Sequence, residues 1–154
     1  MRAVIQRVER ASVSVEGEIR GQIGEGFLVL IGVEEGDGDA DFRYIAEKVP
    51  NLRVFEDEQG KMNRSIQDIG GEILSVSQFT LFADVHKGNR PSFIKVGKPE
   101  HADLMWIKFN EALRSGGVPG KEGRFGAHMR VGLVNDGPVT IVIDTEHDMP
   151  DGTR

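Results

Sequence analysis

Apolar and polar residues alternate through the first part of the chain with the period of two that is typical of β-strands. The alternation covers residues 2–10, continues at 12–15, returns at 19–23 and leads into an apolar run at 27–33. Glycine-containing turns separate these segments, so the pattern predicts three short strands in antiparallel pairing. Arg7 lies within the first strand, where a long cation usually extends its charged head to water.

Two later stretches repeat apolar residues at the spacing of an α-helix. The first stripe consists of Phe42, Ile45, Ala46 and Val49, and we expect this helix to end at Pro50. The second helix begins at Pro99 and stops at residues 115–117, and its stripe consists of Ala102, Met105, Trp106, Phe109 and Leu113. Because Trp106 falls on the stripe, it is more typical of a core residue than of a stacking platform for a base.

The segment 71–82 is rich in β-branched and aromatic residues and predicts a strand with much of both faces covered. Three polar residues, Ser77, Gln78 and Thr80, then fall inside the predicted core. A buried hydroxyl or amide costs about 1–3 kcal/mol when it has no hydrogen-bond partner. Either neighbouring backbone or a ligand must satisfy these groups, and the pattern leaves both readings open.

The linking segments are polar and rich in glycine. Residues 52–55 predict a short strand, residues 56–70 and 120–126 predict loops, and the tail from Glu146 predicts a loose end. With the strands and the two main helices, these segments predict a mixed, strand-rich α/β fold.

Two further strands, at 128–133 and 139–144, are joined through Asn135-Asp-Gly-Pro138. Asp-Gly is an ordinary hairpin signal, but the proline after it removes a backbone donor and restricts the glycine before it. The turn either protrudes and presents its carbonyl groups or forms a plain surface turn.

Composition narrows the class of protein. We expect the 154 residues to form a single domain, 1–154, and the absence of cysteine excludes disulfides and thiolate metal sites. The apolar run at 27–33 is too short to span a bilayer, and the N-terminus carries charges where a signal peptide needs an apolar run. The sequence therefore predicts a soluble, cytoplasmic protein with no membrane partner.

The charge of the chain is −6, with 19 basic and 25 acidic residues, which argues against a protein that coats nucleic acid. Basic residues nevertheless gather at 86–90 and 95–98. This cluster is either a solvated loop or a small patch that holds one end of an RNA.

The residue types limit the chemistry. The four histidines do not share the spacing of a metal site, no glycine-rich loop has the pattern of a phosphate cradle, and no serine sits in a Gly-x-Ser-x-Gly elbow. Hydroxyl, amide and backbone donors remain, and each well-placed donor can stabilise an oxyanion by about 3–4 kcal/mol. Such a site suits an activated ester with a hydroxyl group beside the scissile bond.

Three stretches together identify a family: Ser77-Gln-Phe-Thr-Leu81, Gly88-Asn-Arg-Pro-Ser-Phe93 and Asn135-Asp-Gly-Pro-Val-Thr140. With Met1-Arg-Ala-Val-Ile-Gln-Arg-Val8 and Phe125-Gly-Ala-His-Met129, they resemble the D-aminoacyl-tRNA deacylases of the bacterial and eukaryotic cytosolic type. The likeness spans essentially the whole chain, and five motifs in the right order are very specific.

The resemblance implies a homodimer with barrel-like β-sheets and active sites at the subunit interface. It implies hydrolysis of the ester that joins a D-amino acid, or glycine, to the 3′-terminal adenosine of tRNA, without a metal or organic cofactor. Gly137-Pro138 would carry a cis peptide bond, enter the partner's active site and exclude L-amino acids. Arg7 would hold this turn, which replaces the expectation that its head lies in water.

The resemblance also distributes roles within the pocket. Phe79 and Thr80 would donate to the ester carbonyl, and Ser77 and Gln78 would shape the pocket around it. The adenosine 2′-hydroxyl would assist the attack of water.

The other motif residues receive less definite roles. Phe125 and Met129 would line the adenosine or aminoacyl pocket, and residues 90–93 would shape its entrance. His128 departs from the family, which often carries an acidic residue there. The alternation predicts that its side chain faces away from Met129 and has little effect.

Two other functions stay open at this stage. A conventional serine- or threonine-type hydrolase of small esters would use Ser77 or Thr80 as a nucleophile with a histidine base. A non-catalytic module that binds RNA ends would need no reactive group, although the acidic charge of the chain counts against it.

Overall fold

The computed structural model describes residues 1–150. Its strands are β1 (Arg2–Val15), β2 (Glu18–Ile23), β3 (Gly26–Gly32), β4 (Phe55–Glu56), β5 (Met62–Arg64), β6 (Glu72–Ser77), β7 (Gly120–Glu122) and β8 (Arg130–Asp144). Its helices are α1 (Asp39–Asn51), the 3-10 turn η1 (Phe79–Phe82), α2 (Pro99–Ser115) and α3 (Thr145–Asp148).

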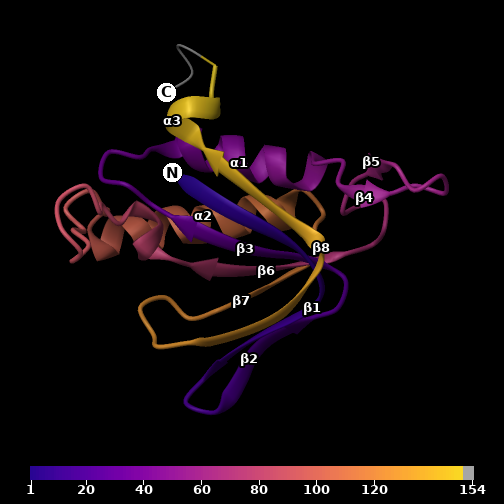
Figure 1. The fold of residues 1–154 in the computed structure, drawn as a ribbon, viewed down its shortest axis with the longest axis horizontal. Coiled ribbons are helices and arrows are strands. Elements are labelled where there is room, and N and C mark those ends of the chain that lie inside the picture. The colour runs from indigo at the N-terminus through magenta and orange to yellow at the C-terminus, as the bar shows by residue number, and fades with distance from the viewer. Residues whose placement is uncertain (151–154) are drawn as a thin grey trace.

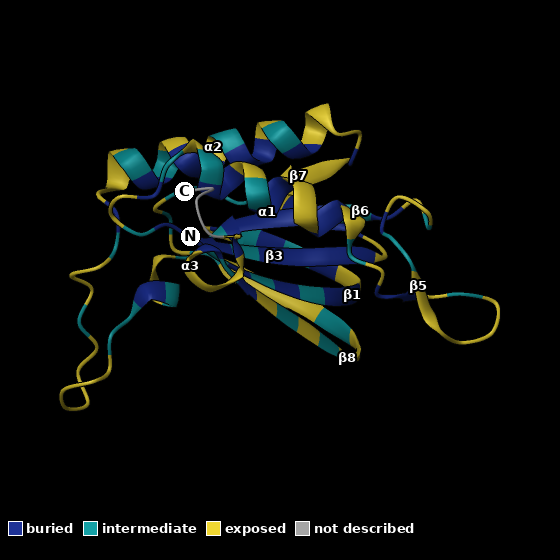
Figure 2. Cartoon of the chain, turned by 90° about the horizontal axis from the view of Figure 1, so that it is seen from above, coloured by how far each residue is buried: buried dark blue, intermediate teal, exposed yellow. Residues whose placement is uncertain are grey.

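One curled sheet contains most of the strands, in the order β2-β1-β3-β6-β7, with β8 paired to the other edge of β1. The pairs that β1 makes are antiparallel, as predicted for the first three strands, whereas β3, β6 and β7 run parallel. Parallel neighbours require a long crossover. Here α1 and α2 supply the crossovers, and both lie on the same face of the sheet (Figures 1 and 2).

The sheet curls until β2 approaches the far strands β6 and β7. Gly21 of β2 permits this approach, because a Cβ atom there would lie 3.0 Å from Lys121 Cβ and 3.2 Å from Leu74 Cδ1. The predicted mixed α/β fold with a barrel-like sheet and two main helices is therefore confirmed.

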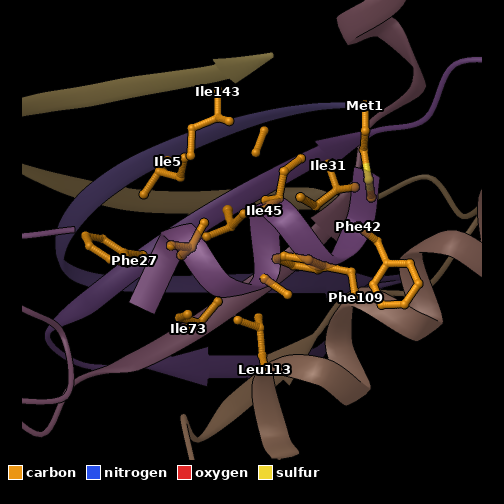
Figure 3. Close-up of a cluster of buried hydrophobic side chains, with 14 of the residues drawn as sticks. Met1, Ile5, Phe27, Ile31, Phe42, Ile45, Ile73, Phe109, Leu113 and Ile143 are labelled. Atoms are coloured by element: carbon orange, nitrogen blue, oxygen red, sulfur yellow. The ribbon is translucent and has the colours of Figure 1, made fainter. Parts of the chain in front are cut away.

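The main core lies between the sheet and the two long helices. Side chains from β1, β3, α1 and α2 interdigitate there, as Figure 3 shows for Ile5, Phe27, Ile45 and Phe109. Trp106 is only 4% exposed, which confirms its assignment to the core. Its indole Nε1 donates to Ser75 Oγ at 2.9 Å, so this buried hydroxyl has a partner.

The prediction of one continuous strand over residues 71–82 is wrong. Strand β6 ends at Ser77, and η1 follows because the Gln78 N–H donates to Ile31 O at 2.7 Å where β3 ends. Ser77 and Gln78 are half-buried and Thr80 is exposed, so these polar groups lie at the edge of the core rather than inside it.

Several boundaries also differ from the prediction. Helix α1 continues through Pro50 to residue 51, and the short strand begins at Phe55 instead of covering 52–55. Strands β5 and β7 lie inside the predicted loops. Both consist of three mostly exposed residues, and their pairing partners, rather than an apolar pattern of their own, define them.

The predicted loose tail is wrong for the residues that the structure describes. Residues 146–148 belong to α3, and Met149 after them is only 8% exposed. The helix begins at the fully buried Thr145, whose Oγ1 accepts from the Met1 amino group at 2.9 Å and donates to Asp41 Oδ1 at 2.6 Å. The rest of the tail, 151–154, lies outside the described residues. No helix within residues 1–150 has the length and apolar character needed to cross a bilayer.

Candidate active site

A cavity of about 680 Å³ opens where β6 ends, between the start of α2 and the segment before β8. Most of its lining is apolar or aromatic. The residues are Val33, Val76, Ser77, Gln78, Phe79, Phe93, Val96, Gly97, Lys98, Pro99, Ala102, Phe125, Gly126, Ala127, His128, Met129 and Val131. Five of the predicted site residues, Ser77, Gln78, Phe79, Phe125 and Met129, therefore meet around one cavity.

The polar edge of the cavity is the junction between β6 and η1. Thr80 is not part of the lining, but its Oγ1 forms a short hydrogen bond with Gln78 Nε2. The N–H groups of Phe79 and Thr80 are the first two of η1 and have no acceptor within that turn. Hydroxyl, amide and backbone donors thus lie together beside an apolar space, which is the arrangement that can polarise a carbonyl group.

Aromatic rings form two walls. Phe79, 53% exposed, packs edge-on against Phe93 with the ring centroids 5.1 Å apart. Phe125, which also lines the cavity, has its ring centroid 6.2 Å from that of Trp106. Met129 Sδ accepts from the Arg124 N–H at 3.4 Å. A flat, apolar ligand such as a nucleobase matches walls of this kind.

Arg7 is the one charged residue among the predicted site residues, and it is buried in the middle of β1. It is 5% exposed, so its head does not extend into water, in agreement with the expectation that had replaced that alternative. Its Nη1 donates to Val54 O at 2.7 Å and its Nε donates to Asp136 O at 2.9 Å. Glu56 and Asp136 also place carboxylate oxygens 3.6 and 3.8 Å away, which compensates for the burial of the charge.

The pattern at residues 135–138 carried an ordinary hairpin signal, but the Gly137-Pro138 turn is not the tip of a hairpin. Both halves of β8 pair with β1, and the turn bulges out between the pairs Val8–Asn135 and Gln6–Thr140, opposite Arg7. Asn135 holds the bulge closed, since its Nδ2 donates to Val139 O at 3.0 Å and its Oδ1 accepts from Val139 N at 2.8 Å.

The turn itself has two unusual backbone features. The Gly137-Pro138 peptide bond is cis, as the family resemblance implied. Gly137 has φ +151°, and a Cβ atom there would lie 2.6 Å from Val139 N, so a larger residue would be strained. Both residues are exposed, and neither lines the cavity of its own chain.

Sequence reasoning missed one wall of the cavity. Residues 96–99 and Ala102, around the start of α2, line it, and only the stripe of α2 and the proline that opens the helix could have indicated them. His128 is not separated from Met129 as the alternation had predicted, and its small effect stays a prediction. His128 lines the cavity together with Met129, because β8 begins only at Arg130 and the alternation does not extend to residue 128.

Among the residues that the structure describes, the carboxyl groups whose pKa values are shifted lie outside the cavity. Burial would raise the pKa of Asp144, but the Arg2 guanidinium at 2.8 Å and the Glu146 N–H outweigh it and hold the pKa below its ordinary value. Hydrogen bonds from Asn63 and from Ser65, respectively, lower the pKa of the exposed carboxyl groups of Asp57 and Asp68.

Comparison with known proteins points to one family. The family model described as D-Tyr-tRNA(Tyr) deacylase matches residues 4–144. A D-aminoacyl-tRNA deacylase of Bifidobacterium longum (strain NCC 2705) is 76% identical over 100% of both chains. Another, from Symbiobacterium thermophilum, is 58% identical over 95% of this chain and 97% of the relative.

Two solved structures share the fold. One, titled c-Myc DNA Unwinding Element Binding Protein, is 46% identical with a TM-score of 0.88, and the match covers 94% of this chain and 98% of the other. The second is described as a probable eukaryotic D-amino acid tRNA deacylase. It has a TM-score of 0.78 at 17% identity, covers 92% and 97% of the two chains, and is a likeness of fold alone.

Proposed function

The chain belongs to the D-Tyr-tRNA(Tyr) deacylase family and is an ester hydrolase of D-aminoacyl-tRNA, and we propose that the cavity beside η1 is its active site. The observation that carries this proposal is the meeting of an apolar, aromatic-walled space with the backbone and side-chain donors of residues 77–80. The 3′-terminal adenosine lies between the aromatic walls. The ester carbonyl then faces the donors of η1.

The reaction needs few groups from the protein. The Phe79 and Thr80 donors stabilise the oxyanion that forms when water attacks the ester carbonyl. The 2′-hydroxyl of the terminal ribose assists the water, and the bond from the carbonyl carbon to the 3′-oxygen breaks to release the free amino acid and tRNA. Ser77 and Gln78 shape the pocket, and the hydrogen bond from Gln78 orients the Thr80 hydroxyl. No acyl-enzyme forms in this scheme.

A second copy of the chain completes the site. Gly137 and Pro138 are exposed and do not line their own cavity, so the turn is free to enter the cavity of a partner. The neighbouring strand β8 is an edge strand with exposed Val131, Leu133 and Val142, and it runs yellow and teal beside β1 in Figure 2. Exposed apolar edges of this kind favour association.

The inserted turn explains chiral selection. Its carbonyl oxygens accept from the α-amino group of the substrate and leave no space where the side chain of an L-amino acid would point. A D side chain, or the hydrogen of glycine, points elsewhere. Steric exclusion can reject a substrate strongly, whereas positive recognition of one methylene contributes only about 1–3 kcal/mol. We also propose a cytoplasmic location, where aminoacyl-tRNA is used.

The direct test is deacylation of D-tyrosyl-, L-tyrosyl- and glycyl-tRNA side by side. We expect release of D-tyrosine and glycine and retention of L-tyrosine. Equal hydrolysis of the D and L esters would contradict the chiral mechanism, and hydrolysis of none would contradict the activity itself.

A further inference from the structure

The loop between η1 and α2 is basic on an otherwise acidic protein. From Asp84 to Lys98 it carries four cations, Lys87, Arg90, Lys95 and Lys98, against one carboxylate, whereas the whole chain carries a charge of −6. All four cations are exposed. Nothing in the mechanism above uses this charge.

These cations are largely free to meet a ligand. Within the described residues, Lys87, Arg90 and Lys98 form no ion pair. Lys95 lies 3.9 Å from Asp84, and both side chains are more than one third exposed. Such a pair contributes little and leaves the ammonium group available.

The loop is anchored and continuous with the cavity. Asp84 and Ser92 exchange two backbone hydrogen bonds of 2.8 Å, which close its base, and the segment between them projects beyond the start of α2 in the pink part of Figure 1. Beyond this base, Phe93 and Lys98 line the cavity. Ile94, 90% exposed beside Lys95, offers an apolar surface to a ribose or a base.

We propose that this basic loop, residues 84–98, binds the phosphates of the nucleotides that precede the terminal adenosine of tRNA. The inference rests on the proposed function, because Phe93 and Lys98 of this loop line the cavity that would hold the last nucleoside of the RNA. Each phosphate contact releases counterions, so binding through the loop depends on salt. The apolar cavity selects the terminal nucleoside, and the loop contributes affinity for the rest of the RNA end.

The test compares the protein with a Lys87→Ala/Lys95→Ala variant, in which neither altered residue lines the cavity. The control variant is Arg20→Ala/Lys48→Ala, which removes two exposed cations of β2 and α1. Deacylation is measured on D-tyrosyl-tRNA and on D-tyrosyl-adenosine, and binding of uncharged tRNA is measured over a series of salt concentrations.

We expect the loop variant to lose on the order of ten-fold in kcat/KM on the tRNA substrate and in tRNA affinity. Its logarithmic salt slope should become shallower by about 1.4, for two contacts on a single strand. Hydrolysis of D-tyrosyl-adenosine should be unchanged, Lys87→Arg/Lys95→Arg should behave as the parent, and so should the control.

The outcomes separate the two proposals. A parent protein that hydrolyses neither ester contradicts the proposed function, and the tRNA-binding series still decides the role of the loop. A loop variant with unchanged tRNA binding and salt slope overturns the inference. Equal losses on both esters also overturn it, because they would mean that the loop only shapes the cavity.

Discussion

The cavity and the Gly137-Pro138 turn are built in opposite ways. The cavity is formed within one chain, by apolar and aromatic side chains around the donors of η1. The turn is an exposed bulge that is fixed by a hydrogen bond from the buried Arg7 to Asp136 O and by one from Asn135 to Val139 O. From this difference we propose a division of labour in which the cavity binds the nucleoside and supplies catalysis, while the turn holds the α-amino group of the substrate and supplies discrimination. Each part can therefore be damaged separately.

The largest effect is expected from Arg7→Ala. Removal of the guanidinium leaves the carbonyl groups of Val54 and Asp136 without their donor, which costs about 1–3 kcal/mol at the buried Val54 oxygen and less at the exposed Asp136. The turn then loses its support, and kcat/KM on D-tyrosyl-tRNA should fall by about 100-fold, as expected for a misplaced positioning group. Urea denaturation and deacylation assays measure the two effects.

The matched control is Arg10→Ala on the same strand. The side chain of Arg10 is 66% exposed and forms an equally exposed ion pair with Glu9 at 3.6 Å, so stability and activity should stay near those of the parent. An Arg7→Ala protein with normal activity would show that Arg7 is not needed to support the turn.

The next effect is expected from Gly137→Ala. The added Cβ atom would lie 2.6 Å from Val139 N at φ +151°, and strain of this kind costs about 1–3 kcal/mol. The bulge must shift, so the ratio of D to L hydrolysis should fall by about 10-fold or more, on the scale of the strain energy. Initial rates on both esters measure this ratio.

Gly132→Ala is the control for this change, because it lies on the same strand and its Cβ atom would meet only Ser12 Oγ, at 3.6 Å. We expect this variant to keep the parental ratio. If both glycine variants changed selectivity equally, the turn would have no special role.

A smaller effect is expected from Thr80→Ala in the cavity region. The hydroxyl is exposed and accepts from Gln78 Nε2, and in the proposed mechanism it assists the oxyanion as a donor and does not attack the ester. Activity should fall by less than about 100-fold, the lower limit for loss of a full oxyanion donor, and the D to L ratio should not change. Labelling by an active-site phosphonate, or a trapped acyl-enzyme, would instead support the serine- or threonine-type esterase.

The smallest effect concerns the Arg2–Asp144 pair, which lies outside both regions. The pKa of Asp144 is lowered in the folded chain, so the carboxylate stabilises the protein above its ordinary pKa, and this stabilisation is lost as pH falls through the lowered value. Asp144→Asn should therefore be less stable than the parent at neutral pH, and the difference should close in acid. Thermal melts across pH test this, and a difference that grew on acidification would contradict the assignment.

The two regions also differ in what the sequence could predict. Helical stripes and short alternating strands correctly predicted both long helices, the first three strands and the core position of Trp106, because burial dictates residue type at those positions. The end of β6 at Ser77 could not be predicted from the sequence, because a hydrogen bond from Gln78 to the distant Ile31 ends the strand.

Long-range pairing explains the other errors. The sequence signal Asp-Gly-Pro predicted a turn but not that both halves of β8 would pair with β1 around a bulge. Local pattern cannot reveal a partner more than one hundred residues away. The wall formed by α2 was missed for a similar reason, since Lys98 and Ala102 face the cavity only after the crossover returns α2 to the sheet.

The most direct test of the central claim is complementation between two defective variants. Gly137→Ala impairs the turn, and Ser77→Trp fills the cavity. If the turn of one chain completes the cavity of another, an unfolded and refolded equimolar mixture should regain about one quarter of the parental selective sites, since half of the dimers are mixed and each carries one intact site. A mixture whose activity and selectivity stayed at the mean of the two variants, with mixed dimers verified by native mass spectrometry, would contradict the claim.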